Sequence, residues 1–185
     1  MKNKFLKFSL LLFIFIIGLT ADIVTKQFAK TEIKNQSTIT IINGFLEFSY
    51  VENRGMVFGA LNNQSTDLKR YALTALTIIS IIIILTIIWR IRELPFLYHL
   101  PFFMIFSGAI GNLIDRLRFG YVVDFIHMHI GRILDWPFLY NFADAYVCIG
   151  MGILILQSFT GEKKKPASQG AQMPSNDSRL ENNHP

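Results

Sequence analysis

The sequence predicts a membrane protein whose fold is an all-α bundle of four transmembrane helices, with a small β-sheet at one membrane face. Three observations favour this class over a soluble domain. Hydrophobic residues make up 51% of the 185 residues, against 17% charged residues, and the mean hydropathy is +0.38. Four stretches are long and apolar enough to cross a hydrocarbon core of roughly 30 Å. Two of the segments between them alternate like β-strands.

The first span, at about residues 5–24, has two interpretations. Lys2, Lys4 and Lys7 precede a long apolar run, as in the n- and h-regions of a secretory signal peptide. No clear A-x-A cleavage site follows this run, and three more spans come after it. We therefore expect a retained helix, with the side chain of Lys7 reaching back toward the headgroups.

The other three spans are expected at about residues 71–89, 94–114 and 144–161. The second contains no acid or base apart from one tyrosine and is the clearest span in the chain. The fourth opens on Asp144, which would be a favoured N-cap for a helix that starts at Ala145.

Two long segments face the side opposite to the termini and complete a membrane domain of residues 1–161. At about residues 34–61, β-branched and aromatic residues alternate around Asn43-Gly44, which predicts a hairpin. The segment at about 115–141 contains "GYVVDFIHMHIG", which alternates like a strand. The tail, residues 162–185, is polar and rich in Pro, Ser, Asn and Gln, so we expect it to be disordered.

The orientation in the membrane follows from the first helix. An even number of spans puts both termini on one side, and the 18 lysines and arginines divide equally between the two sides. Because the first helix usually dominates and three lysines precede it, we expect the termini and the tail in the cytoplasm.

Polar residues gather at one of the two predicted membrane faces, whereas ordinary helix caps would be expected at both. They are Asp22, Lys26, Asn53, Asn112, Asp115, Arg116, Asp124, Asn141 and Asp144.

Each member of this group has an ordinary explanation when it is considered alone. Asp22 and Lys26 are four residues apart on a helix and would form a solvated pair. The stretch from Asn53 to Gly55 resembles a turn, and Asp115 is best interpreted as a headgroup contact. Their combination at one face is what indicates a functional site.

Four motifs carry a resemblance to a known family. "DIVTK" at 22–26, "NRGMVFG" at 53–59, "GAIGNLIDRLRFGYVVDF" at 108–125 and "NFAD" at 141–144 together resemble the lipoprotein signal peptidase (signal peptidase II) family. The resemblance covers all four spans. It implies a multi-pass aspartyl protease of the bacterial inner membrane, with a small extracytoplasmic β-cradle and its active site at the extracytoplasmic face.

The family's activity sets further expectations. Its members remove signal peptides from prolipoproteins by cleaving before the diacylglyceryl-modified cysteine. The resemblance therefore implies lipidated prolipoproteins and membrane lipids as partners, no nucleic acid, no cofactor, no metal and a monomeric chain.

Residues of the family's site are carried over position by position. Asp124 and Asp144 match the catalytic dyad. The remaining matches, which would support the site or contact substrate, are Asp22, Lys26, Asn53, Gly55, Gly108, Asn112, Arg116, Asn141 and Ala143.

The chain departs from the family pattern at three places. Ser107 and Val57 replace small residues, which are minor changes. "WPFLYNFAD" is one residue longer before the asparagine than the family pattern, which concerns how Asn141 and Asp144 are presented and leaves room for a local shift there.

Paired carboxylates suit peptide hydrolysis by water. Two neighbouring acids cannot both ionise cheaply, so they share one proton. The ionised member draws a proton from water, while the protonated member binds the scissile carbonyl and later protonates the leaving amine. The sequence does not say which aspartate takes which part.

Other functions remain open at this point. His127 and His129 alternate on one strand near Asp124 and could serve a metal-dependent protease, although no H-E-x-x-H motif is present. Ser107 could serve a serine protease, but no paired base is evident. A small transporter or an assembly scaffold is the alternative outside enzymes, and a transporter would place ionisable groups nearer the bilayer midplane.

Overall fold

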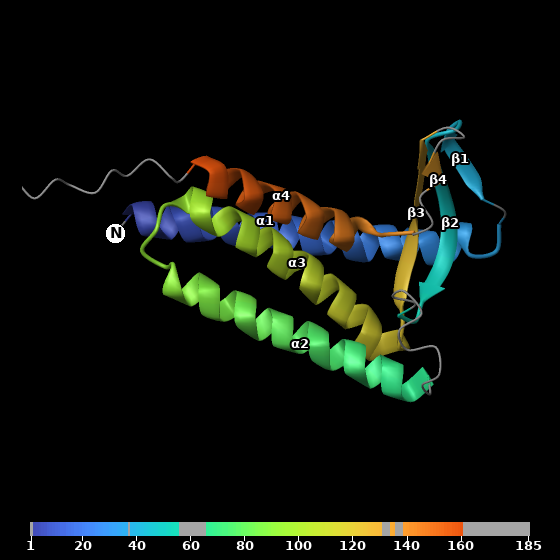
Figure 1. Ribbon diagram of the computed structural model, residues 1–185, viewed down its shortest axis with the longest axis horizontal. Helices are drawn as coiled ribbons and strands as arrows, with labels where there is room; N and C mark the ends of the chain where they lie inside the picture. Colours follow the sequence, from blue (N-terminus) through green and yellow to red (C-terminus); the bar gives the residue numbers. More distant parts are fainter. Residues whose placement is uncertain (1, 37, 56–65, 131–133, 136–138, 161–185) are drawn as a thin grey trace, which may run out of the picture.

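The computed structural model describes residues 2–36, 38–55, 66–130, 134–135 and 139–160 (Figure 1). Its helices are α1 (Lys2–Phe28), η1 (Ala29–Ile33, a π-helical turn), α2 (Thr66–Arg90), α3 (Phe96–Phe119) and α4 (Phe142–Thr160). Its strands are β1 (Ile39–Ile42), β2 (Leu46–Asn53), β3 (Val122–Ile130) and β4 (Leu134–Asp135). Val57 and the tail predicted to be disordered lie outside the described residues.

Four helices are long and apolar enough to cross a membrane, as the hydropathy predicts. Their outer faces expose large apolar side chains such as Phe5, Ile82 and Leu156, at 76%, 57% and 67%. Such faces suit a lipid surrounding, because apolar side chains that contact acyl chains are not exposed to water.

The helices extend further than the apolar runs. α1 continues beyond residue 24 to Phe28, and α3 continues beyond residue 114 to Phe119. Asp115 and Arg116 are thus helical, whereas the third predicted span ends at residue 114. Gly120 then ends α3, since it adopts φ +80° and donates its backbone N–H to the Arg116 carbonyl.

α3 is the central helix and packs against α1, α2 and α4 (Figure 1). Gly108 makes its contact with α4 possible, because a Cβ there would lie 2.4 Å from the Ala143 carbonyl oxygen. Two residues expected near the site, Gly108 and Ala143, therefore bring the backbones of α3 and α4 together.

The strands form one antiparallel sheet in the order β1-β2-β3-β4. β1 and β2 form the predicted hairpin, whose turn contains Gly44 at φ +71°. β3 is the strand predicted from "GYVVDFIHMHIG". The sheet lies at the end of the helix bundle remote from the N-terminus (Figure 1).

A small apolar core joins the sheet to α1. It consists of Ala29 and Ile33 from η1 with Val123 and Phe125 from β3, and all four are at most 4% exposed. The extension of α1 into η1 therefore positions β3 over the ends of the helices.

Candidate active site

Most of the predicted polar group comes together where α1, α3, α4 and β3 meet. Asp22, Lys26, Asp124 and Asn141 are each at most 3% exposed, and Asp144 is half-buried. Charged groups at this depth require charge partners or hydrogen bonds. The structure supplies both.

Asp124 lies on β3 and its carboxylate accepts two amide hydrogen bonds. Asn53 donates Nδ2–H to Oδ2 at 2.7 Å, and Asn141 donates Nδ2–H to Oδ1 at 2.7 Å. The chain before α4 runs beside β3, because Tyr140 and Ile126 exchange backbone hydrogen bonds of 3.0 and 2.8 Å. This pairing brings Asn141 next to Asp124.

Asp144 lies in the first turn of α4 and is not its N-cap. The helix begins at Phe142, so the cap is Asn141, whose Oδ1 accepts the Asp144 N–H at 3.0 Å. Asp144 Oδ2 accepts the Asn141 backbone N–H at 3.2 Å, which completes a reciprocal capping box. The expectation that Asp144 caps a helix starting at Ala145 is wrong, because Asn141 is an equally good cap one turn earlier.

The other oxygen of Asp144 binds a third asparagine. Asn112 of α3 donates Nδ2–H to Asp144 Oδ1 at 2.8 Å, and its own Oδ1 accepts Asn141 Nδ2–H at 3.2 Å. Asn141 thus bonds to both carboxylates and to Asn112. The two predicted catalytic aspartates are linked through one residue.

A group that can only donate fixes the orientation of each of these amides. Asn53 Oδ1 accepts the Gly55 N–H at 2.9 Å, in a turn where Gly55 adopts φ +91°. Asn112 Oδ1 accepts Lys26 Nζ at 2.9 Å, and Asn141 accepts a backbone N–H as described above. Since each oxygen is occupied by a donor, each NH₂ group is turned toward an aspartate.

Lys26 is also the centre of a buried charge cluster. Its Nζ lies 2.8 Å from Asp22 Oδ2 and 3.3 Å from Asp115 Oδ2, with the lysine side chain only 4% exposed. Asp22 accepts the Ala143 N–H at 2.9 Å, which satisfies a backbone donor in the first turn of α4. Asp22 and Lys26 are thus a buried pair, not the solvated pair expected of them taken alone.

Asp115 is a third charged member of this cluster, although it is not among the residues that match the family's site. It is 6% exposed and accepts the Val123 N–H at 3.1 Å, so it anchors the start of β3 to α3. The headgroup contact expected for Asp115 is wrong. The sequence does offer one indication of its role. Asp115 directly precedes Arg116, a predicted site residue, at the end of an apolar helix.

Arg116 lies beside this network and bonds toward α2. Its Nη1 donates to Thr77 Oγ1 at 3.3 Å and to the Asn112 carbonyl at 3.5 Å. Its described hydrogen bonds reach neither the Asp124 nor the Asp144 carboxylate.

The surroundings of Asp124 favour its protonated form. Burial is the main cause, the charge of Asp144 adds to it, and together they raise the pKa of Asp124 to about 6. The bonds from Asn53 and Asn141 act in the opposite direction without cancelling the rise.

This shift predicts how stability depends on pH. Between the ordinary value of 3.8 and about 6, the folded chain binds more protons at Asp124 than the unfolded chain does. Stability should therefore fall as the pH rises through this range. We expect the melting temperature in detergent to fall more steeply from about pH 4 to about pH 7 for the unmodified chain than for Asp124→Asn. If the melting temperatures of the unmodified chain and of Asp124→Asn changed with pH in parallel, the raised pKa of Asp124 would be contradicted.

The residues of the rival sites lie apart from this network. Ser107 is buried and donates its hydroxyl to the Phe15 carbonyl at 3.0 Å, so it holds α3 to α1. His127 and His129 lie next to Glu47 on β2, and these three could hold a metal ion.

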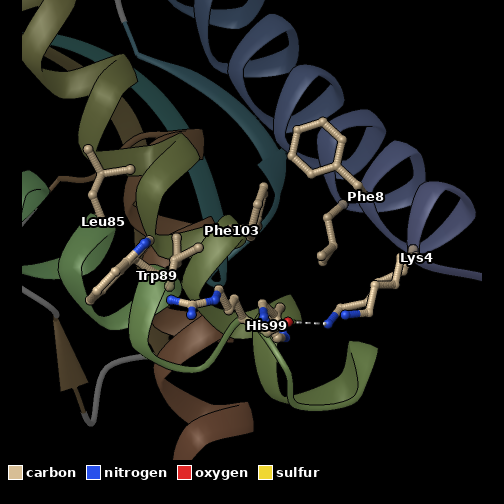
Figure 2. Close-up of a pocket in the computed structure, with 10 residues that line it drawn as sticks. Lys4, Phe8, Leu85, Trp89, His99 and Phe103 are labelled. Atoms are coloured by element: carbon tan, nitrogen blue, oxygen red, sulfur yellow. Dashed lines mark hydrogen bonds between the residues drawn. The ribbon is translucent and has the colours of Figure 1, made fainter. Parts of the chain in front are cut away.

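A cavity of about 340 Å³ lies at the opposite end of the bundle (Figure 2). Its lining includes Phe8 from α1, Leu85 and Trp89 from α2, and Phe103 from α3, together with two lysines near the start of α1. None of the predicted site residues lines it. The polar network, and not this apolar cavity, is the candidate active site.

Comparison with known families agrees with the sequence motifs. A protein-family model described as "Signal peptidase (SPase) II" matches residues 14–160. The matched range contains α2, α3, α4, the part of α1 from residue 14 onward and every residue of the polar network.

Individual relatives match over most of their length. Proteins named lipoprotein signal peptidase from Clostridium tetani and Clostridioides difficile are 35% and 36% identical to this chain. The matches cover 77% and 84% of this chain and 88% and 97% of those proteins. Two solved chains described as bacterial membrane enzymes have TM-scores of 0.68 and 0.64 at 26% identity. Each covers 85% of this chain, with 95% and 94% of their own length aligned.

Proposed function

Because this chain belongs to the signal peptidase II family, a family of bacterial membrane proteases, we propose that it removes signal peptides from prolipoproteins with an aspartate dyad. Cleavage would take place before the diacylglyceryl-modified cysteine. The observation that carries the proposal is the network around Asn141, which bonds to Asp124 of β3 and to Asp144 of α4. Family membership sets aside the transporter and scaffold alternatives.

The dyad would act through one shared proton and one water molecule. The raised pKa of Asp124 favours it as the carboxyl that keeps the proton and binds the scissile carbonyl. Asp144 would then accept a proton from the attacking water. The amides of Asn53, Asn112 and Asn141 hold both carboxylates in place, so little reorganisation is needed when the substrate binds.

The location of the network suits a lipidated substrate. Acyl chains hold a diacylglyceryl cysteine at the membrane surface. The network lies where α1, α3 and α4 meet β3, and the sheet lies at that end of the bundle (Figure 1). Binding energy from the acyl chains, which are remote from the scissile bond, can orient that bond. We place this end of the bundle, with the sheet, on the extracytoplasmic side and the termini in the cytoplasm.

The test is cleavage of a purified diacylglyceryl-modified precursor by the purified chain in detergent, with the product mass identifying the bond. We expect a product that begins at the modified cysteine.

We also expect cleavage to survive exhaustive chelation and serine-directed reagents, because the proposed chemistry uses neither a metal nor a hydroxyl nucleophile. Loss of cleavage on chelation with recovery on adding zinc would instead favour the metal-dependent alternative, and loss with serine reagents would favour Ser107.

A further inference from the structure

We propose that Glu47, His127 and His129 form a binding site for a divalent transition-metal ion of the zinc class. This site is separate from the aspartate dyad and lies on the sheet. One ligand atom from each of the three residues lies within 4.8 Å of the other two. The proposal concerns metal binding alone, so it can fail without affecting the proposed protease activity.

The register of the sheet brings these three side chains together. His127 and His129 are two residues apart on β3, so their side chains project from the same face. Glu47 on β2 is the direct partner of His127 in the antiparallel pairing. The backbone of β3 is held here by a 2.8 Å hydrogen bond from the His129 N–H to the Phe45 carbonyl. The ligands are therefore fixed by paired strands and not by a loose loop.

The side chains of Glu47, His127 and His129 lie close enough together to bind one ion. His129 Nε2 lies 3.2 Å from Glu47 Oε2, and the two imidazole rings are 4.1 Å apart between centroids. Thr40 of β1, which is paired with Glu47 across the sheet, donates its hydroxyl to the other carboxylate oxygen at 3.4 Å. A group that binds the second oxygen of a ligating carboxylate orients the first oxygen toward the metal. Thr40 is thus a positioning residue for this site.

The donor set selects the class of ion. Two imidazole nitrogens and one carboxylate oxygen suit zinc and its neighbours copper and nickel, with a fourth position left for water. Calcium and magnesium prefer six or more oxygen ligands and should bind far more weakly. Side-chain exposures of 18% for His129 and 28% for Glu47 leave room for an ion to enter.

The alternation of β3 separates this site from the dyad. Asp124 is an odd number of positions away from His127 and His129, so its side chain projects from the opposite face of the strand. A bound ion would link β2 to β3 near the hairpin, and its expected effect is greater stability of the sheet.

The experiment is zinc titration of the purified full chain in detergent, without a polyhistidine tag and after removal of metal by chelation and dialysis. Isothermal calorimetry with zinc chloride should show saturable binding of one zinc ion per chain. Zinc should also raise the melting temperature, because a ligand that binds only the folded state stabilises it. Magnesium chloride at the same concentration should give neither signal.

Variants separate a built site from incidental zinc binding. His127→Gln and His129→Gln should lose this saturable binding, and Thr40→Val should weaken zinc binding about tenfold or more. Glu52→Gln is a control on β2, the strand that carries Glu47. Glu52 pairs with Lys34 and Arg54, and this variant should bind zinc normally. Absence of saturable zinc binding in the unmodified chain, or equal binding by the histidine variants, would overturn the proposal.

Discussion

Asp144→Asn and Asp124→Asn are each expected to cleave a diacylglyceryl-modified precursor about 10²–10⁴-fold more slowly than the unmodified chain, because general acid–base chemistry contributes on this order. The double variant should be little worse than either single variant. Two carboxyls that share a proton act as a unit, so removing one already removes the function of the pair.

The structure indicates how the Asp144→Asn chain should fold. The new Oδ1 can still accept the Asn141 N–H, so the capping box of α4 survives. The new NH₂ group then faces the NH₂ of Asn112, and that hydrogen bond is lost. We expect a modest fall in melting temperature and normal binding of the lipidated precursor.

Asp67→Asn is the matched control for this prediction, since Asp67 is an exposed acid in the first turn of α2. It should cleave and melt like the unmodified chain. Near-normal turnover by Asp144→Asn would mean that this acid has only a capping role, and the protease mechanism proposed above would fall with it.

Lys26→Met is expected to destabilise the chain by about 3–5 kcal/mol, because it leaves the buried carboxylates of Asp22 and Asp115 without their cation. It also removes one of the two donors to Asn112 Oδ1, so the amide that binds Asp144 is held less firmly and cleavage should fall as well. Thermal unfolding in detergent and the cleavage assay measure the two effects.

Two further variants test whether the effect comes from buried charge. Lys4→Met removes a lysine whose pair with Glu93 is 79% and 69% exposed, and it should change stability little. Asp22→Asn in the Lys26→Met background should restore part of the lost stability, since Asn still accepts the Ala143 N–H. If Lys26→Met melted like Lys4→Met, the buried cluster would contribute nothing to folding.

Local signals in the sequence predicted the elements of this fold well. A long apolar run has few alternatives to a membrane helix, and Asn43-Gly44 between apolar stretches has few alternatives to a hairpin turn. Both predictions are confirmed. The ends of the helices were harder to predict, because α3 continues past its apolar run through Asp115 and Arg116, which contact β3 and α2.

Two features could not be predicted from the sequence, namely the residue that caps α4 and the partner of the two histidines, because both depend on contacts between distant segments. Asn141 replaces Asp144 as the cap of α4 because Tyr140 pairs with Ile126 and fixes where the helix begins. The neighbours of β3 depend on a register shift in β2 between Phe48 and Val51. Glu47 faces His127 only as a result of that register, so the sequence offered the two histidines without their third partner.

The candidate site is divided between elements that are synthesised at different times. Asp22 and Lys26 come from the first membrane helix and Asp124 from the sheet, whereas Asp144 comes from the last membrane helix and Asn141 is the residue that caps it. A ribosome-bound chain that has inserted three spans lacks Asp144 and lacks the amide that bridges to Asp124. The protease would therefore be inert throughout its own membrane insertion, and arrival of α4 would act as the step that switches on hydrolysis.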